Sequence, residues 1–180
     1  MLTPNDAVLV VVDVQGKLAG LMHEAAALFE NVARLVRGCR ALGVPVIWME
    51  QNPKGLGPTV PEVAAAMPEG LSPISKMSFG CCGEPRFIAA LEASGRRQVL
   101  LAGIEAHICV HQTAVALKAR GYEVHLVADA VSSRKPFNRD LAIARLGRGT
   151  AELTSVEMAL FEMLGTAEHP AFREVARLVK

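Results

Sequence analysis

Four short apolar runs alternate along the chain with longer stretches of mixed apolar and polar residues. The runs are dominated by Val, Ile, Leu and Ala, and they cover residues 7–13, 44–50, 98–104 and 123–129. A short apolar run of this kind predicts a strand that is buried on both faces. The four runs are therefore expected to form the centre of one sheet.

The stretches between these runs have the spacing of amphipathic helices. Residues 25–42 carry apolar side chains at helical intervals, and Gly43 and Pro45 then supply a stop. Gly95 and Gly121 mark the ends of two further helices, because glycine suits the left-handed backbone that follows a helix. The predicted elements after residue 42 are helices at 85–93, 107–120, 137–146 and 155–164 and a short strand at 151–154. Thr154 or Ser155 is the expected N-cap of the last helix.

Alternating strands and helices predict the α/β fold class. We expect three layers, with a mostly parallel sheet and helices on both of its faces, as in doubly wound, Rossmann-like proteins. Residues 52–83 differ, because prolines and glycines break every periodicity and leave at most one short helix near 60–66. Long loops of this kind are usually functional. The length of 180 residues predicts a single domain spanning 1–180.

Composition narrows the class of partner. The chain is 51% hydrophobic and 21% charged, with a net charge of +1, and its basic residues are scattered. This pattern favours a small-molecule substrate and speaks against nucleic acid. No membrane association is expected, because the first apolar run is far shorter than the roughly 20 residues that a span needs. Four cysteines without a secretory signal favour a cytoplasmic location.

Candidate chemistry lies just after the strands, because ligands of open parallel sheets bind beyond the carboxyl ends of the strands. Asp13 ends the first apolar run and is expected to be partly desolvated, although a lone aspartate there could simply accept backbone hydrogen bonds. Lys76 lies in the long excursion, and most lysines are solvated. Cys109 lies near the start of a predicted helix, where unpaired amides and a nearby cation lower a thiol pKa. The alternative is a small core cysteine.

Three segments that contain these residues resemble the signature segments of isochorismatase-like hydrolases in the same chain order. They are residues 11–15, 74–79 and 103–110, and the likeness continues through 123–125 and 127–134. The resemblance implies that Asp13 is the general base, that Cys109 is the nucleophile and that Lys76 assists both. It also implies an oxyanion hole made of the Glu105 and Cys109 backbone amides, with a cis peptide bond before Glu105.

The chain departs from nicotinamidase-type relatives at their metal site. Glu50, Gln51 and Asn52 stand where those relatives carry an aspartate and nearby histidines, and no histidine lies between His23 and His107. We therefore expect no metal and no cofactor, as in the metal-free branch of the superfamily. His107 and His111 are four residues apart on a predicted helix, but no third ligand accompanies them, so packing or a subunit contact is the expected role.

These observations predict a cysteine-dependent hydrolase that cleaves a C–N bond of a small amide-like metabolite through a thioester on Cys109. Position alone makes four residues candidate substrate contacts, namely Gln15, Trp48, Gln51 and Phe79. Two alternatives remain open, which are vinyl-ether cleavage of the isochorismate type and a catalytically silent, oligomeric interaction protein. A homo-oligomer is expected in either case, because relatives assemble and because the helix at 155–164 is strongly apolar.

Overall fold

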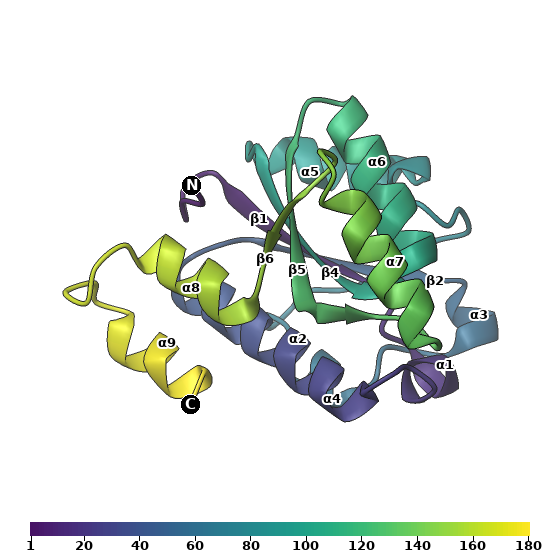
Figure 1. The fold of residues 1–180 in the computed structure, drawn as a ribbon, viewed down its shortest axis with the longest axis horizontal. Coiled ribbons are helices and arrows are strands. Elements are labelled where there is room, and N and C mark those ends of the chain that lie inside the picture. The colour runs from purple at the N-terminus through teal and green to yellow at the C-terminus, as the bar shows by residue number, and fades with distance from the viewer.

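A computed structural model describes residues 1–180 and has one six-stranded sheet at its centre. All neighbouring strands are parallel, in the order β3-β2-β1-β4-β5-β6. The strands are β1 (Ala7–Val12), β2 (Val46–Gln51), β3 (Ile74–Lys76), β4 (Gln98–Ile104), β5 (Glu123–Ser132) and β6 (Glu152–Thr154). Helices cover both faces of this sheet (Figure 1), so the predicted three-layer α/β class is confirmed. The expectation that residues 1–180 form one domain stays a prediction.

Two groups of helices enclose two apolar cores. One face of the sheet carries α2 (Ala25–Ala41) and α8 (Val156–Leu164), and α9 (Phe172–Leu178) lies against α2 (Figure 1). The other face carries α5 (Pro85–Ala93), α6 (His111–Ala119) and α7 (Pro136–Leu146). β1 is buried along its whole length and supplies alternate residues to the two cores. This is the double-sided burial that its continuous apolar run predicts.

Several helix ends follow the predicted local chemistry. Gly95 and Gly121 adopt φ values of 67° and 79° just past α5 and α6. The Ser155 side chain accepts a hydrogen bond from the Met158 amide and so caps α8. These residues fix where each helix stops or starts, and thereby the lengths of the connections between layers.

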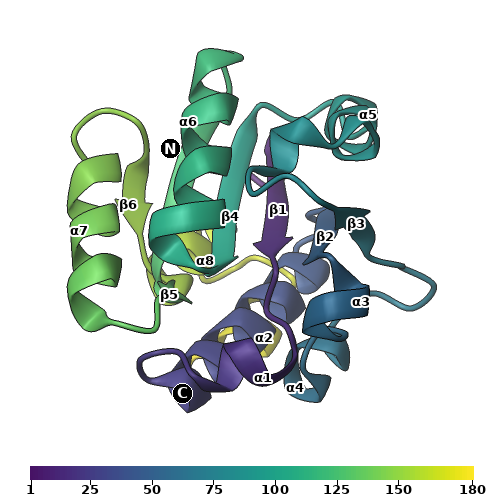
Figure 2. The same cartoon turned by 90° about the vertical axis from the view of Figure 1, so that its right-hand side faces the viewer.

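The long excursion contains more regular structure than its prolines and glycines suggest. It forms α3 (Pro53–Leu56), α4 (Pro61–Ala64) and the edge strand β3, which pairs with β2 through Gln51 opposite Lys76. The expectation of at most one helix is therefore wrong. β3 is only three residues long, so it has no periodicity to read, and tertiary pairing with β2 defines it. The helices α1 (Gly16–Gly20) and α3 lie at the end of the sheet toward which β1 points (Figure 2).

Gly103 shapes the end of β4. Its φ is 116°, and a Cβ atom there would lie 2.0 Å from the Val12 carbonyl oxygen. Only glycine fits such an approach, and the register of β4 against β5 shifts between Leu101 and Gly103. A π-helical turn, Ala106–Val110, follows directly and leads into α6. The strand therefore delivers the segment around Cys109 to the carboxyl edge of the sheet.

The strongly apolar helix α8 is largely accommodated within the chain. Val156, Leu160 and Met163 are buried in the core, and the Phe161 ring packs edge-on against Phe172 of α9 at 6.3 Å. Met158 remains 62% exposed. The apolar character of this helix is therefore weaker evidence for self-association than the sequence suggested. None of the helices combines the length and apolarity required to cross a membrane.

Candidate active site at the carboxyl ends of the strands

A cavity of about 220 Å³ lies at the carboxyl edge of the sheet. Asp13 follows β1, Lys76 ends β3 and Cys109 lies on the π-helical turn after β4, so three distant segments meet there. The helices α1 and α3 lie at the same edge (Figure 2). The cavity is lined by Asp13, Leu18, Gln51, Leu56, Phe79, Ile104, Glu105, Ile108 and Cys109.

Lys76 is buried and fully engaged. Only 1% of the residue is exposed. Its Nζ donates to Asp13 Oδ2 at 2.7 Å, to Gln51 Oε1 at 2.8 Å and to the carbonyl oxygens of Phe79 at 2.8 Å and Ser78 at 3.2 Å. Because four acceptors surround one ammonium group, Lys76 supplies a fixed positive charge to Asp13. It has no free donor for a substrate.

Asp13 has one carboxylate oxygen in use and one free. The residue is 3% exposed, has a φ of 54° and donates its backbone amide to the Met49 carbonyl at 3.2 Å. Oδ2 binds Lys76, whereas Oδ1 is buried and accepts no hydrogen bond from a nitrogen or hydroxyl group. Burial raises the pKa of Asp13 above its ordinary value of 3.8, although Lys76 and the Cys109 thiol act in the opposite direction. A buried carboxylate with a free oxygen beside a thiol is suited to accept a proton.

The surroundings of the Cys109 thiol favour its protonated form. Burial raises its pKa to about 12, the adjacent Asp13 carboxylate adds to this effect, and Lys76 opposes it. The expectation of a thiolate stabilised by a helix start is therefore wrong, because burial and the Asp13 charge outweigh the contribution of the nearby amides. The backbone of Cys109 is held by Thr113, whose hydroxyl donates to the Cys109 carbonyl at 2.6 Å and accepts from the Cys81 amide at 3.0 Å.

Glu105 links β4 to the π-helical turn that carries Cys109. The Ile104–Glu105 peptide bond is cis. The Glu105 backbone hydrogen-bonds the Cys109 thiol, which lowers the thiol pKa in part. The Glu105 carboxylate is 6% exposed and accepts from the Arg134 backbone amide at 3.0 Å and from the Arg134 guanidinium at 3.2 Å. This double attachment anchors the backbone that faces the thiol.

Two of the four predicted substrate contacts lie elsewhere. Gln51 and Phe79 line the cavity, but Gln15 and Trp48 do not. Gln15 is fully buried, with its amide donating to the Gly57 carbonyl at 2.6 Å and accepting from the Gln51 backbone at 2.7 Å. The Trp48 indole donates to the Thr59 hydroxyl at 2.8 Å. Both side chains are used to hold the loop after β2, so the structure does not support substrate contact for them.

Four residues of the site were not predicted from the sequence, of which two are apolar lining residues and two position other groups. Leu18 on α1 and Leu56 on α3 line the cavity. The close approach of α1 to α3 depends on Gly16, where a Cβ atom would lie 2.1 Å from the Leu56 carbonyl oxygen. Arg134 binds the distant Glu105 carboxylate, and Thr113 binds the distant Cys81 amide, so no local sequence pattern marks either residue. Glycines at 16, 55 and 57 were the one available signal for the close approach of α1 and α3.

The two helical histidines have separate surroundings. His107 Nδ1 lies 2.9 Å from the Ser133 hydroxyl, and His107 Nε2 lies 3.3 Å from Asn138 Nδ2. Burial and the nearby Arg145 lower the pKa of His111. No group of three or more His, Cys, Asp or Glu side chains is arranged to hold a metal ion. The residues of this structure therefore present no donor set for a metal at the site.

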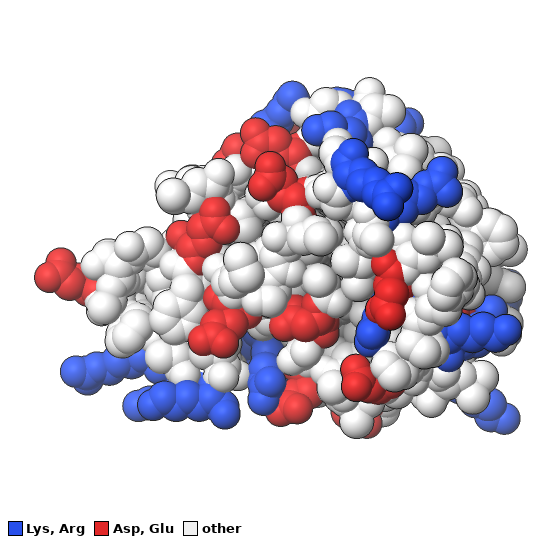
Figure 3. All heavy atoms as spheres, viewed as in Figure 1, with Lys and Arg blue, Asp and Glu red and all other residues white.

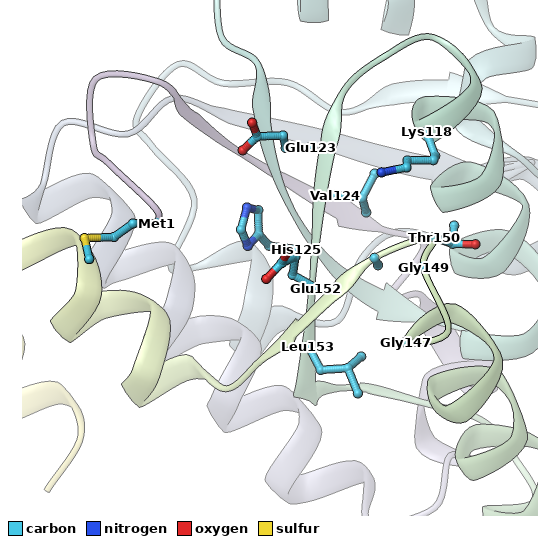
Figure 4. Close-up of a pocket in the computed structure, with 11 residues that line it drawn as sticks. Met1, Lys118, Glu123, Val124, His125, Gly147, Gly149, Thr150, Glu152 and Leu153 are labelled. Atoms are coloured by element: carbon cyan, nitrogen blue, oxygen red, sulfur yellow. The ribbon is translucent and has the colours of Figure 1, made fainter.

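A second hollow of about 420 Å³ lies at the amino ends of β5 and β6 (Figure 4). Met1, Lys118, Glu123, His125 and Glu152 are among its lining residues. It is larger than the cavity beside Cys109, but it contains no cysteine and no paired acid and cation at hydrogen-bond distance. Nucleophilic chemistry is therefore expected at the smaller cavity.

Comparison with known proteins shows which family the chain is similar to. Residues 7–158 match the model of the isochorismatase domain. Isochorismatase domain-containing protein 2 of Danio rerio is 41% identical over 178 residues, which cover 99% of this chain and 89% of that protein. The structure of the MAR1 ribonuclease from Caenorhabditis elegans is 36% identical with a TM-score of 0.94, covering 99% of this chain and 91% of that chain.

A bacterial structure adds a description of activity and assembly. The YcaC gene product of Escherichia coli, described as an octameric hydrolase of unknown specificity, is 26% identical with a TM-score of 0.90, and the match covers 98% of this chain and 88% of that chain. The family match extends over both β1 and the π-helical turn with Cys109. The chain belongs to the isochorismatase-like hydrolase family.

Proposed function

We propose that this protein is a cysteine-dependent hydrolase that cleaves the C–N bond of a small amide through a thioester on Cys109. The observation that carries the proposal is the asymmetric Asp13 carboxylate. One oxygen is held by Lys76 at 2.7 Å, the other is buried and has no hydrogen-bond partner, and the carboxylate interacts with the Cys109 thiol. A nucleophile beside a base that is itself oriented by a third group is the general arrangement of covalent hydrolases.

In the proposed reaction, Asp13 Oδ1 accepts the thiol proton as Sγ attacks the amide carbonyl carbon. The carbonyl oxygen becomes an oxyanion, which the backbone amides of Glu105 and Cys109 stabilise. Asp13 then gives the proton to the leaving nitrogen, the C–N bond breaks and the amine departs. Water, deprotonated by Asp13, hydrolyses the thioester to release a carboxylic acid and restore the thiol.

The high resting pKa of Cys109 is compatible with this step. Part of the rise comes from the negative charge of Asp13, and that charge disappears once Asp13 has taken the proton. Lys76 stays next to the pair in both states and compensates the single negative charge wherever it lies. The proton transfer therefore moves a charge within a neutralised site and does not create an additional one.

Cleavage of isochorismate or of RNA would require free cationic side chains to bind an anionic substrate, and this cavity has none. Isochorismate and RNA are both anionic, whereas Lys76 is saturated and Arg134 is paired with Glu105. On the face shown in Figure 3, acidic side chains extend from the left edge across the middle, and basic side chains form several separate groups, so no continuous basic surface is present on this face. We therefore favour amide hydrolysis over vinyl-ether cleavage, and over the ribonuclease activity named for the nematode protein. A silent scaffold would have no need of a free, buried base beside a thiol.

We also propose that the chain forms a homo-oligomer in the cytoplasm. The octameric state described for the Escherichia coli neighbour and the exposed apolar side chains of Phe137 and Met158 support self-association. All four cysteines are unpaired, which suits a reducing compartment. Light scattering at micromolar concentration should give a mass above that of a 19.2 kDa monomer.

The proposed function is tested by incubating the protein with a panel of small amides and measuring both amine release and protein mass. We expect an acyl adduct on the peptide that contains Cys109. Cys82 is the internal control, because it is the one cysteine that is partly exposed and it has no paired carboxylate and lysine beside it. Amide hydrolysis that persists unchanged in Cys109→Ala would contradict the mechanism.

A further inference from the structure

The polar atoms that line the cavity are almost all in use. Gln51 accepts from Lys76 through Oε1 at 2.8 Å and donates to the Met77 carbonyl through Nε2 at 2.9 Å. The Glu105 carboxylate is occupied by Arg134. The groups left for a substrate are Asp13 Oδ1, the Cys109 thiol and the Glu105 backbone that hydrogen-bonds this thiol. All of these serve the reacting carbonyl, so none is left for a polar substituent elsewhere on the substrate.

The remaining wall is hydrocarbon. Leu18, Leu56, Phe79 and Ile108 come from four different segments and surround the space next to the thiol. Phe79 is 57% exposed and lies where the cavity meets solvent. A group that extends from the reacting carbonyl into this space contacts mainly apolar side chains, because the polar atoms of Gln51 and Glu105 are bound elsewhere. Its burial is favourable in proportion to its apolar area.

The cavity disfavours both a negatively charged and a positively charged substituent on the substrate, for different reasons. A carboxylate in the cavity would lie near Asp13 and Glu105 and would find no unpaired cation, because Lys76 is saturated. An ammonium group would lose its water against leucine side chains, and both nearby carboxylates are already paired. Burial of an unpaired charge of either sign is expensive. A neutral substituent avoids both costs.

From these contacts we infer that the substrate is a small, uncharged amide whose acyl group is apolar. The inference rests on the proposed function and specifies its substrate class. The volume of about 220 Å³ also limits size, since pockets for drug-sized ligands usually measure about 300 to 1,000 Å³. Short aliphatic amides and single-ring aromatic amides fit this description, whereas dicarboxylates and nucleotides do not.

Three amides of nearly equal length test the inference directly. Butyramide is neutral, succinamate carries a terminal carboxylate and 4-aminobutyramide carries a terminal ammonium group. We expect kcat/KM for butyramide to exceed that of each charged amide by at least about 100-fold, because the loss of hydration is not compensated in the cavity. Comparable values for butyramide and either charged amide would overturn the inference and leave the proposed hydrolase intact.

A matched pair of alkylating agents gives a readout that does not depend on turnover. Iodoacetamide is neutral, and iodoacetate is its anionic counterpart. We expect the ratio of their rates at Cys109, followed by peptide mass spectrometry, to exceed the ratio for glutathione by at least about tenfold. An equal ratio would contradict the substrate class. If neither reagent labels Cys109 and no amide is hydrolysed, the proposed function and the inference fail together.

A single substitution should redirect the preference. Leu56→Lys places an ammonium group on the α3 wall, and Leu56→Met is the control of similar volume without charge. The lysine variant should raise the succinamate to butyramide ratio of kcat/KM by at least about tenfold. The methionine variant should keep the wild-type preference. If the ratio is unchanged in a lysine variant that still hydrolyses butyramide, the acyl group does not lie against this wall and the inference is wrong.

Discussion

The two ends of the sheet each contain one buried side-chain atom without a hydrogen-bond partner. At the carboxyl end it is Asp13 Oδ1, and at the amino end it is Nε2 of His125 on β5. Their surroundings differ. Asp13 is oriented by Lys76 and interacts with the Cys109 thiol, whereas the imidazole of His125 lies between Glu123 and Glu152 (Figure 4) with no cysteine in its hollow.

This comparison shows that a buried unpaired atom indicates catalysis only when other reactive groups converge on it. Burial lowers the pKa of His125 and outweighs the neighbouring glutamates, so the fold favours the neutral imidazole. Burial raises the pKa of Asp13, but Lys76 keeps an ionised carboxylate available. One site therefore has a base, a cation and a nucleophile in contact. The other has an unsatisfied imidazole nitrogen and no cysteine among its lining residues.

The largest expected difference between the two ends is in turnover. Cys109→Ala should lower kcat by on the order of 10⁴-fold or more, because the nucleophile is lost. His125→Leu should leave kcat and KM for the same amide nearly unchanged. Steady-state kinetics with butyramide measure both. A large loss of kcat in a well-folded His125→Leu variant would show that the two ends are coupled and would break the comparison.

Asp13 and Lys76 should behave as one unit. Asp13→Asn and Lys76→Met should each lower kcat/KM by roughly 10² to 10⁴-fold, because both act on the same proton transfer. The double variant should be nearly as poor as the worse single variant, since groups that act together are strongly non-additive. Losses that multiply in the double variant would indicate independent roles.

The same pair should dominate the stability of the site. Lys76→Met leaves the Asp13 charge buried without its cation, which costs about 3 to 5 kcal/mol in comparable buried pairs. Adding Asp13→Asn should recover much of this loss, because a neutral amide needs no cation. Urea denaturation of the four proteins gives the coupling free energy. If Asp13→Asn does not restore stability, the ion pair is not the cause of the loss.

The sequence predicted the carboxyl end much better than the amino end. Asp13 and Cys109 follow long apolar strands, so their place at the carboxyl edge follows from the parallel topology. The position of Lys76 on β3 depends on pairing with β2, which no local pattern specifies. The thiol pKa was wrongly expected to be low, because burial and the Asp13 charge are tertiary effects. His125 lies within a strand, and nothing in its neighbours marks its nitrogen as unpaired.

The pH dependence of activity sharpens the contrast, because burial raises the pKa of Asp13 and lowers the pKa of His125. Asp13 must be ionised to accept the thiol proton, and burial raises its pKa. The acid limb of kcat/KM should therefore lie above the ordinary value of 3.8 for aspartate. No alkaline loss through the thiol is expected below its pKa of about 12.

Glu50 provides a matched control for the acid limb. Its charge raises the pKa of Asp13, while its carboxylate accepts from the Thr59 amide at 2.7 Å. Glu50→Gln keeps an acceptor for that amide and should move the acid limb to lower pH. An acid limb at or below 3.8 in the wild-type protein, or a shift to higher pH in Glu50→Gln, would exclude Asp13 as the titrating base.

The smallest expected effect is the pH dependence of stability caused by His125. Its folded-state pKa lies below the ordinary value of 6.5 because of burial, so the unfolded chain binds more protons between those two values. Its contribution to stability is therefore complete above 6.5 and is lost as the pH falls toward the folded-state pKa. In His125→Leu, Tm should fall less steeply with acid than in the wild type. His111 is half-buried on a helix, and its pKa is also lowered. His111→Leu should reduce the slope of Tm against pH by less than His125→Leu does. Parallel curves for wild type and His125→Leu would mean that His125 keeps its proton on folding. Such a histidine would then pair with Glu123 or Glu152, and the amino end would no longer contain an unsatisfied atom.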